Sequence, residues 1–265
     1  MAAKKSDEMP FLDHLEELRW RLIWAIGALG VGLAIGVFVV VHFNAIYFLE
    51  KPILPYLHGR KLVYTHPGDT FSILMSASLV VGGIIALPMI AYQIWLFLSP
   101  ALYKREKKMV IPVVVAGTLL FAAGVALAYY FVLPLALDYL LHLESDALDP
   151  MITASEYFGF VTTLCVAFGA VFELPLVITG LTALGIVKPQ FLTRYRRHAI
   201  VACWAVAAVI TPGDFLGTTF ALAIPLYLLY EVSVVVSYII YRRREKRHAA
   251  LLAEAEAEAG GGEPA

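Results

Sequence analysis

Long apolar stretches separated by short polar segments dominate the 265-residue chain. A helix that crosses about 30 Å of hydrocarbon needs roughly 20 apolar residues. Apolar runs occur at about 22–43, 71–98, 109–137, 157–187, 198–212 and 215–240. The fifth run extends only about 22 Å at 1.5 Å per residue, and the segment TPGD joins it to the sixth as a hairpin. The pattern predicts an all-α membrane protein with six transmembrane helices.

Lysine and arginine residues are unevenly shared between the loops of this topology. Seventeen of the 20 basic residues lie in 1–21, 104–108, 188–197 and 242–247, which six spans place on one side. The other three (Lys51, Arg60 and Lys61) lie in the first loop on the opposite side. Because basic loops stay in the cytoplasm, we predict that both the N- and the C-terminus are cytoplasmic.

The runs and charges divide the chain into three regions. Residues 1–21 form a cytoplasmic amphipathic segment, and 22–241 form the six-helix transmembrane domain. Residues 242–265 begin with a basic cluster and continue with Ala, Glu and Gly. We expect this tail to be disordered, because it has no apolar face to bury.

Prolines and small residues indicate how the predicted helices pack. Prolines recur within the runs, and each bends its helix, so we expect a concave wall instead of a compact bundle: Pro88, Pro112, Pro175 and Pro225. Ala28, Gly32 and Gly36 recur every fourth residue, a spacing typical of close helix contact. The opposite-side loops 44–70 and 134–156 are long enough to form a structured periplasmic cap.

The composition excludes several classes of protein. The chain is 60% hydrophobic and 15% charged, whereas soluble proteins carry about 25% charged residues. Its two cysteines lie in apolar runs, and its seven histidines show no metal-binding spacing. No nucleotide-binding motif is present. We therefore expect no enzyme activity, catalytic residue, metal, cofactor or nucleic-acid partner.

Acidic residues inside the runs are candidates for a functional role. A carboxylate near the bilayer centre costs roughly 2.5–3.5 kcal/mol on insertion scales. Glu173 is the only acid in its run, and Pro175 nearby frees a backbone carbonyl. The resulting polar notch suits water, a proton, a donor from a partner, or an intramolecular partner such as Gln93. Glu231 is either functional or snorkels to the interface, and Asp214 is either functional or a turn residue.

The segment before the first span carries more charge than an anchor needs. Helical spacing makes residues 11–21 amphipathic and places Glu17 four residues before Arg21, where the two can form an ion pair. Glu106 stands among four basic residues in the second cytoplasmic segment. Two isolated carboxylates on one side of the membrane suit a dicationic ligand. Guanidinium groups fit best, because they bind carboxylates bidentately and keep their charge.

Four separated motifs resemble the TatC family, the six-helix core subunit of the twin-arginine protein translocase. They are HLEELRWRL, YQIWLFLSPALYKREKK, FELP and ITPGD, and the resemblance covers about residues 9–241. It implies a protein of the plasma (inner) membrane that binds the Arg-Arg signal peptide of folded export substrates. It also implies recruitment of single-span TatA-type and TatB-type partners, transport driven by the proton-motive force, self-association and contact with membrane lipid.

The resemblance also assigns roles to individual residues. It implies a signal-peptide site made of Glu17, Arg19, Phe97, Leu102, Tyr103 and Glu106. Glu173 is implied to meet a polar residue of the TatA-type partner, and Thr211 and Asp214 belong to the implied docking region. Pro52 matches a proline of the periplasmic cap.

Two other functions compete with this one. A proton-coupled small-solute transporter would use Glu173 as its coupling site, but it needs a repeat or paired discontinuous helices, and neither is visible. That function also leaves Glu17 and Glu106 unexplained. A scaffold that binds no signal peptide is the third option, and it differs in that these two carboxylates would not matter.

Overall fold

The computed structural model describes residues 9–57, 59–98, 110–142, 151–183, 185–210 and 217–260. The regular elements within these ranges are all helical, and five helices are long and apolar enough to cross a membrane. They are Leu15–His42, Asp69–Phe97, Val110–Leu141, Ala154–Ala183 and Leu222–Arg242. The predicted all-α, multi-pass architecture is therefore confirmed. The short fifth run is helical as α9 (Arg196–Ile210), but at 15 residues it is not among these spans, so the sixth span remains a prediction.

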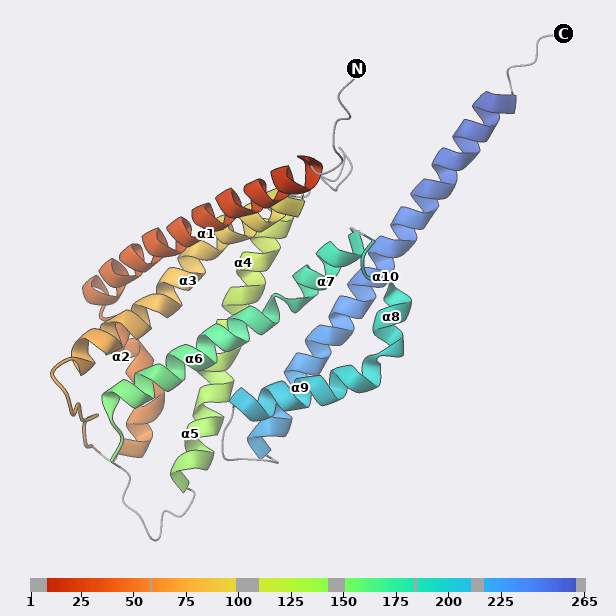
Figure 1. Ribbon diagram of the computed structural model, residues 1–265. Helices are drawn as coiled ribbons and strands as arrows, with labels where there is room; N and C mark the ends of the chain where they lie inside the picture. Colours follow the sequence, from red (N-terminus) through yellow and green to blue (C-terminus); the bar gives the residue numbers. More distant parts are fainter. Residues whose placement is uncertain are drawn as a thin grey trace.

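The helices α1 (Met9–His42) and α3 (Asp69–Leu98) run in opposite directions side by side (Figure 1). Two of the small residues singled out in the sequence, Gly32 and Gly36, are buried in this contact. A Cβ atom added to Gly82 of α3 would lie 2.6 Å from the carbonyl oxygen of Gly32. The two backbones therefore touch directly, and the α1 register against α3 is fixed by glycine.

The middle of the molecule consists of two interrupted helices that pack against each other. The first is α4 (Val110–Leu127), followed by the π-helical turn η4 (Ala128–Val132) and α5 (Leu133–His142). The second is α6 (Ala154–Phe172), followed by α7 (Leu174–Ala183). The run 157–187, expected as one helix, is thus broken at Glu173.

The prolines within the runs fall into two groups. Pro112 lies in the first turn of α4 and Pro175 in the first turn of α7, where the missing N–H would have no helical partner anyway. Pro88 and Pro225 lie inside continuous helices, α3 and α10. Two of the four prolines therefore mark helix starts, not interior bends.

The other edge of the molecule is formed by α8 (Pro189–Arg194), α9 and α10 (Gly217–Gly260), with α10 lying between α7 and α9. A buried hydrogen bond of 2.7 Å joins Thr182 of α7 to Ser237 of α10. The helix α10 continues through the tail to Gly260, where the sequence predicted disorder. Ala, Glu, Leu, Lys and Arg are strong helix formers, and an existing helix extends more easily than a new one nucleates.

The two long loops expected to form a cap contact each other. The chain between α1 and α3 contains α2 (Ala45–Glu50) and the 3₁₀ helix η1 (Lys51–Leu57). The backbone N–H of Ala154 donates to the Val63 carbonyl at 2.7 Å, which joins the two loops. The Tyr157 hydroxyl donates to the Leu49 carbonyl at 2.7 Å, and the Tyr129 hydroxyl donates to the Phe48 carbonyl. The first of the two loops is thus anchored to the spans by side-chain hydrogen bonds.

The helices form an open array, with α1 packed on α3 at one edge and α9 packed on α10 at the other (Figure 1). Large apolar side chains point outward along the helices, among them Trp24, Phe38 and Val209. This arrangement gives most helices a face for lipid, as expected of a membrane protein.

Candidate functional site

The N-terminal segment is continuous with the first span. Helix α1 begins at Met9 and runs without a break to His42, so the predicted amphipathic segment and the first span are one helix. On it, Nη2 of Arg21 donates to Oε1 of Glu17 at 2.9 Å. The two side chains are 29% and 32% exposed, respectively. The ion pair predicted from their spacing is confirmed.

A third residue, Gln93 of α3, joins this pair. Its side chain is 5% exposed, and its Oε1 accepts a hydrogen bond of 3.4 Å from Nη1 of Arg21. The guanidinium of Arg21 therefore connects the Glu17 carboxylate on one helix with the amide on the next. Gln93 was named as a possible partner of Glu173, but among the described residues its hydrogen-bond partner is Arg21, and Oε1 of Glu173 has none.

The remaining expected signal-site residues are only partly described. Arg19 is exposed on α1, and Phe97 is half-buried on α3, one turn beyond Gln93. The N-terminal end of α1 lies beside the C-terminal end of α3 (Figure 1), so both residues belong to the end of the array that carries Glu17. Leu102, Tyr103 and Glu106 lie outside the described residues. The approach of Glu106 to Glu17 stays a prediction.

Glu173 occupies the junction between α6 and α7. Its backbone N–H bonds to the Ala170 carbonyl at 3.2 Å, which closes α6. Its Oε1 is buried without a hydrogen-bond partner among the described residues. A Cβ atom added to Gly117 of α4 would lie 3.3 Å from Oε2, so the carboxylate fills the space that this glycine leaves open. The unsatisfied acceptor of the notch inferred from the sequence is present, but the Val171 carbonyl that Pro175 was expected to free is a partner of the Glu173 N–H.

The other expected residues lie elsewhere. Thr211 and Asp214 are outside the described residues. Pro52 is half-buried at the second position of η1, within the segment that Tyr129 and Tyr157 anchor. Nearby, the Tyr56 hydroxyl donates to Oδ1 of Asp138 at 3.4 Å. Burial and the Asp138 carboxylate together raise the pKa of the Tyr56 phenol.

One cluster was not predicted from the sequence. Nη2 of Arg196, at the start of α9, lies 2.8 Å from Oε2 of Glu231 on α10. The Tyr227 hydroxyl donates to the other oxygen of Glu231 at 2.6 Å. The tyrosine was detectable, because it lies one helical turn before Glu231. The arginine was not, because it is 35 residues away along the chain.

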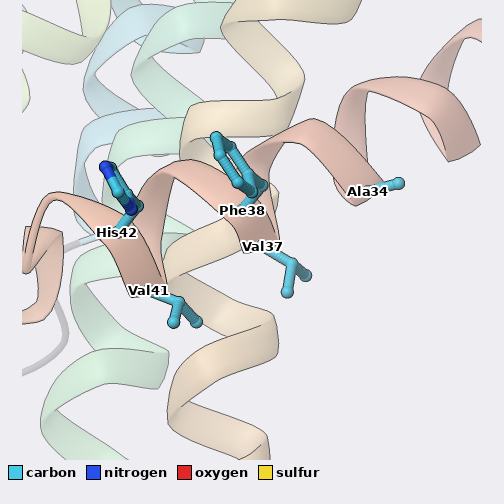
Figure 2. Close-up of a pocket in the computed structure, with 5 residues that line it drawn as sticks. All are labelled: Ala34, Val37, Phe38, Val41 and His42. Atoms are coloured by element: carbon cyan, nitrogen blue, oxygen red, sulfur yellow. The ribbon is translucent and has the colours of Figure 1, made fainter.

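A shallow hollow of about 480 Å³ lies on the outer face of α1. Figure 2 shows Phe38 and His42 on one side of it and Val37 and Val41 on the other, with Ala34 at the far end. The Phe38 and His42 rings stack with centroids 5.5 Å apart. One helix supplies the whole lining, and its only titratable group is His42. Within the described ranges, no group of three or more His, Cys, Asp or Glu side chains is placed to hold a metal ion.

An open array of apolar helices, with a charged cluster at one end and an unsatisfied carboxylate between two spans, defines a multi-pass membrane protein. Its sequence matches the family model described as Sec-independent protein translocase protein (TatC) over residues 13–225. The chain belongs to the TatC family. It is accordingly a component of a protein translocase, not an enzyme.

Individual relatives agree with this assignment. The chain is 36% identical over 247 residues to the Sec-independent protein translocase protein TatC of Desulforapulum autotrophicum, covering 92% of this chain and 89% of that protein. It is 39% identical to the TatC of Aquifex aeolicus, covering 90% and 98% of the two chains. A crystal structure described as the twin-arginine translocase receptor TatC is similar, with a TM-score of 0.73 and 38% identity. That match covers 86% of this chain and 99% of the other. A small-solute transporter is not favoured.

Proposed function

We propose that the chain is the receptor of the translocase and that it binds the Arg-Arg signal peptide of folded export substrates at the Glu17 end. The observation that carries this proposal is the contact between Glu17 and Arg21. A partly exposed carboxylate at the end of the array already holds a guanidinium group at 2.9 Å. The position is therefore suited in charge and geometry to the side chain that the signal supplies in duplicate.

The remaining parts of the proposed site follow from the sequence. Glu106 supplies a second carboxylate, so that each arginine of the signal meets one acid. We expect Phe97, Leu102 and Tyr103 to contribute apolar and aromatic surface to the site, and Arg19 to contribute from the same helix as Glu17. An apolar stretch of the signal then lies along the concave side of the helical array.

The proposal includes recruitment of TatA-type and TatB-type single-span partners. Glu173 supports this step, because its buried Oε1 lacks a donor within the described chain and leaving an acceptor unsatisfied is costly. A polar side chain from a partner helix would satisfy it. Thr211 and Asp214, which follow α9 in the sequence, mark the proposed docking region. Folded cargo is too large for this array, so the chain acts as receptor and organiser while the proton-motive force supplies energy.

We place the chain in the plasma (inner) membrane with both termini in the cytoplasm. The excess of basic residues in 1–21, 104–108, 188–197 and 242–247 supports this orientation. It puts Glu17 on the cytoplasmic side and the cap around Pro52 on the periplasmic side. In this arrangement residues 1–21 and 242–265 flank a six-helix domain, 22–241, that contacts lipid and self-associates in a larger complex.

Site-specific crosslinking to a twin-arginine signal peptide in membranes tests the proposal. We expect strong crosslinking that requires the arginine pair and falls in Glu17→Ala and Glu106→Ala. It should survive Glu173→Ala, which acts at the later, partner-dependent step. Equal crosslinking of a Lys-Lys peptide, or indifference to both cytoplasmic carboxylates, would refute the receptor function and favour a scaffold.

A further inference from the structure

We infer that Arg21 is an internal competitor for the signal-peptide site: it occupies the Glu17 carboxylate in the free protein, and an incoming arginine displaces it. The inference rests on the proposed function, because it concerns the same carboxylate. It adds a residue that sets how tightly the site binds.

The first observation is that one guanidinium makes two contacts at once. Arg21 donates from Nη2 to Glu17 at 2.9 Å and from Nη1 to Gln93 at 3.4 Å. The Gln93 amide is almost fully buried on α3, so it offers a fixed second anchor. Arg21 is therefore held across two helices, unlike an isolated pair on the surface of one helix.

The second observation concerns which atoms are engaged. A guanidinium binds a carboxylate most strongly through two parallel N–H···O bonds, which use both carboxylate oxygens. Arg21 engages Oε1 of Glu17. An arginine of the signal peptide that binds both oxygens of Glu17 must use that same oxygen, and it brings a second positive charge beside Arg21, so the two guanidinium groups compete for Glu17. After displacement, Arg21 keeps its hydrogen bond to Gln93, so its guanidinium retains one partner.

Competition has a defined effect on affinity. If Arg21 is bound to Glu17 in most molecules of the free protein, the apparent affinity for the signal peptide falls in proportion to the fraction of molecules in which Glu17 is open. A partly exposed ion pair with one additional hydrogen bond should lower the fraction of open sites by a factor of about two to ten. Removing Arg21 should therefore strengthen peptide binding. A purely structural role, in which Arg21 only orients Glu17, predicts weaker binding.

The experiment uses the full chain in lipid nanodiscs and a fluorescent twin-arginine signal peptide, with the dissociation constant measured by anisotropy. Arg21→Gln should bind the peptide two- to tenfold more tightly than wild type. Gln93→Leu, which removes only the second anchor, should give a smaller gain. Arg196→Gln is the matched control, because it removes an equal charge from a 2.8 Å ion pair with Glu231 at another site. It should leave affinity unchanged.

The Glu17→Gln variant distinguishes a failure of this inference from a failure of the proposed function. If Glu17→Gln does not weaken binding, the proposed site itself fails. Suppose instead that Glu17→Gln weakens peptide binding, while Arg21→Gln weakens binding or leaves it unchanged. The receptor function then stands, and the inference that Arg21 competes with the peptide is refuted. An equal gain in Arg21→Gln and Arg196→Gln would also overturn it, since net charge alone would explain both. Thermal unfolding of each variant shows that it is folded.

Discussion

Substituting Gly82 by alanine tests how the α1–α3 contact positions Glu17. The added Cβ would lie 2.6 Å from the Gly32 oxygen, 2.8 Å from its carbonyl carbon and 2.9 Å from the Leu33 Cα atom. Ordinary contacts of a Cβ atom begin at 3.4 Å, so the helices must separate by about 0.8 Å. All three atoms belong to the backbone, and no side chain can rotate to make room.

Overpacking of this kind costs about 1–3 kcal/mol. For a chain of this size we expect a loss of about 2–4 °C in Tm for each kcal/mol. The separation should also break the hydrogen bond between Arg21 and Gln93, which is already 3.4 Å long. Gly82→Ala should therefore lower thermal stability and loosen the Glu17 end together.

Gly83→Ala is the matched control, because it lies on the same helix and its added Cβ would meet nothing within 4 Å. Alanine is a better helix former than glycine, so this variant should be neutral or slightly stabilised. The assay is thermal unfolding of both variants in one detergent. A second measurement is disulfide crosslinking between cysteines placed at Arg21 and Gln93, whose side chains contact each other across the two helices. Equal stability and equal crosslinking in the two variants would refute the reasoning.

Three further predictions concern other contacts. Tyr157→Phe should lower stability by about 1–3 kcal/mol in thermal unfolding, because it leaves a buried carbonyl without its donor; no change would contradict the anchoring role. Because burial, and then the Asp138 carboxylate, raise the pKa of Tyr56, ionisation of its phenol should destabilise the fold as the pH rises from about 10 through the folded-state pKa. Unfolding scans at pH 8 and 11 should show a smaller pH effect in Tyr56→Phe than in wild type. Gly117→Val should close the notch around Glu173 and reduce crosslinking to a TatA-type partner, while signal-peptide binding stays intact.

The sequence predicted contacts within one helix better than contacts between helices. Glu17 and Arg21 pair because helical geometry brings residues four apart together, and that geometry is visible in the sequence. Gln93 was missed as their partner because it is 72 residues from Arg21, and the contact depends on the register that glycines impose between α1 and α3. The partner of Glu231 was missed for the same reason.

Helix boundaries show a second limit. Hydropathy predicted a single helix over 157–187, but the structure breaks it at Glu173 and starts α7 beside Pro175. The signal for the break was Pro175, which is disfavoured inside a helix, and hydropathy alone does not register it. Thr153 precedes α6 and lies three residues before Glu156, which is the spacing of a capping box, yet its side chain forms no cap hydrogen bond. Spacing thus located the start of the helix without giving the bonds that stabilise it.

The length of α10 has a consequence for large molecules near the Glu17 end. The helix has 44 residues and spans about 66 Å, more than twice the thickness of the hydrocarbon core. Beyond Arg242 it projects about 27 Å, on the side of the array where α1 begins (Figure 1). If a folded domain is tethered to a peptide at Glu17, as proposed above, it shares this side of the array with a helix whose projection is similar to the width of a small domain. The space that this helix occupies is closed to the cargo, so we expect cargo to approach Glu17 from the other directions.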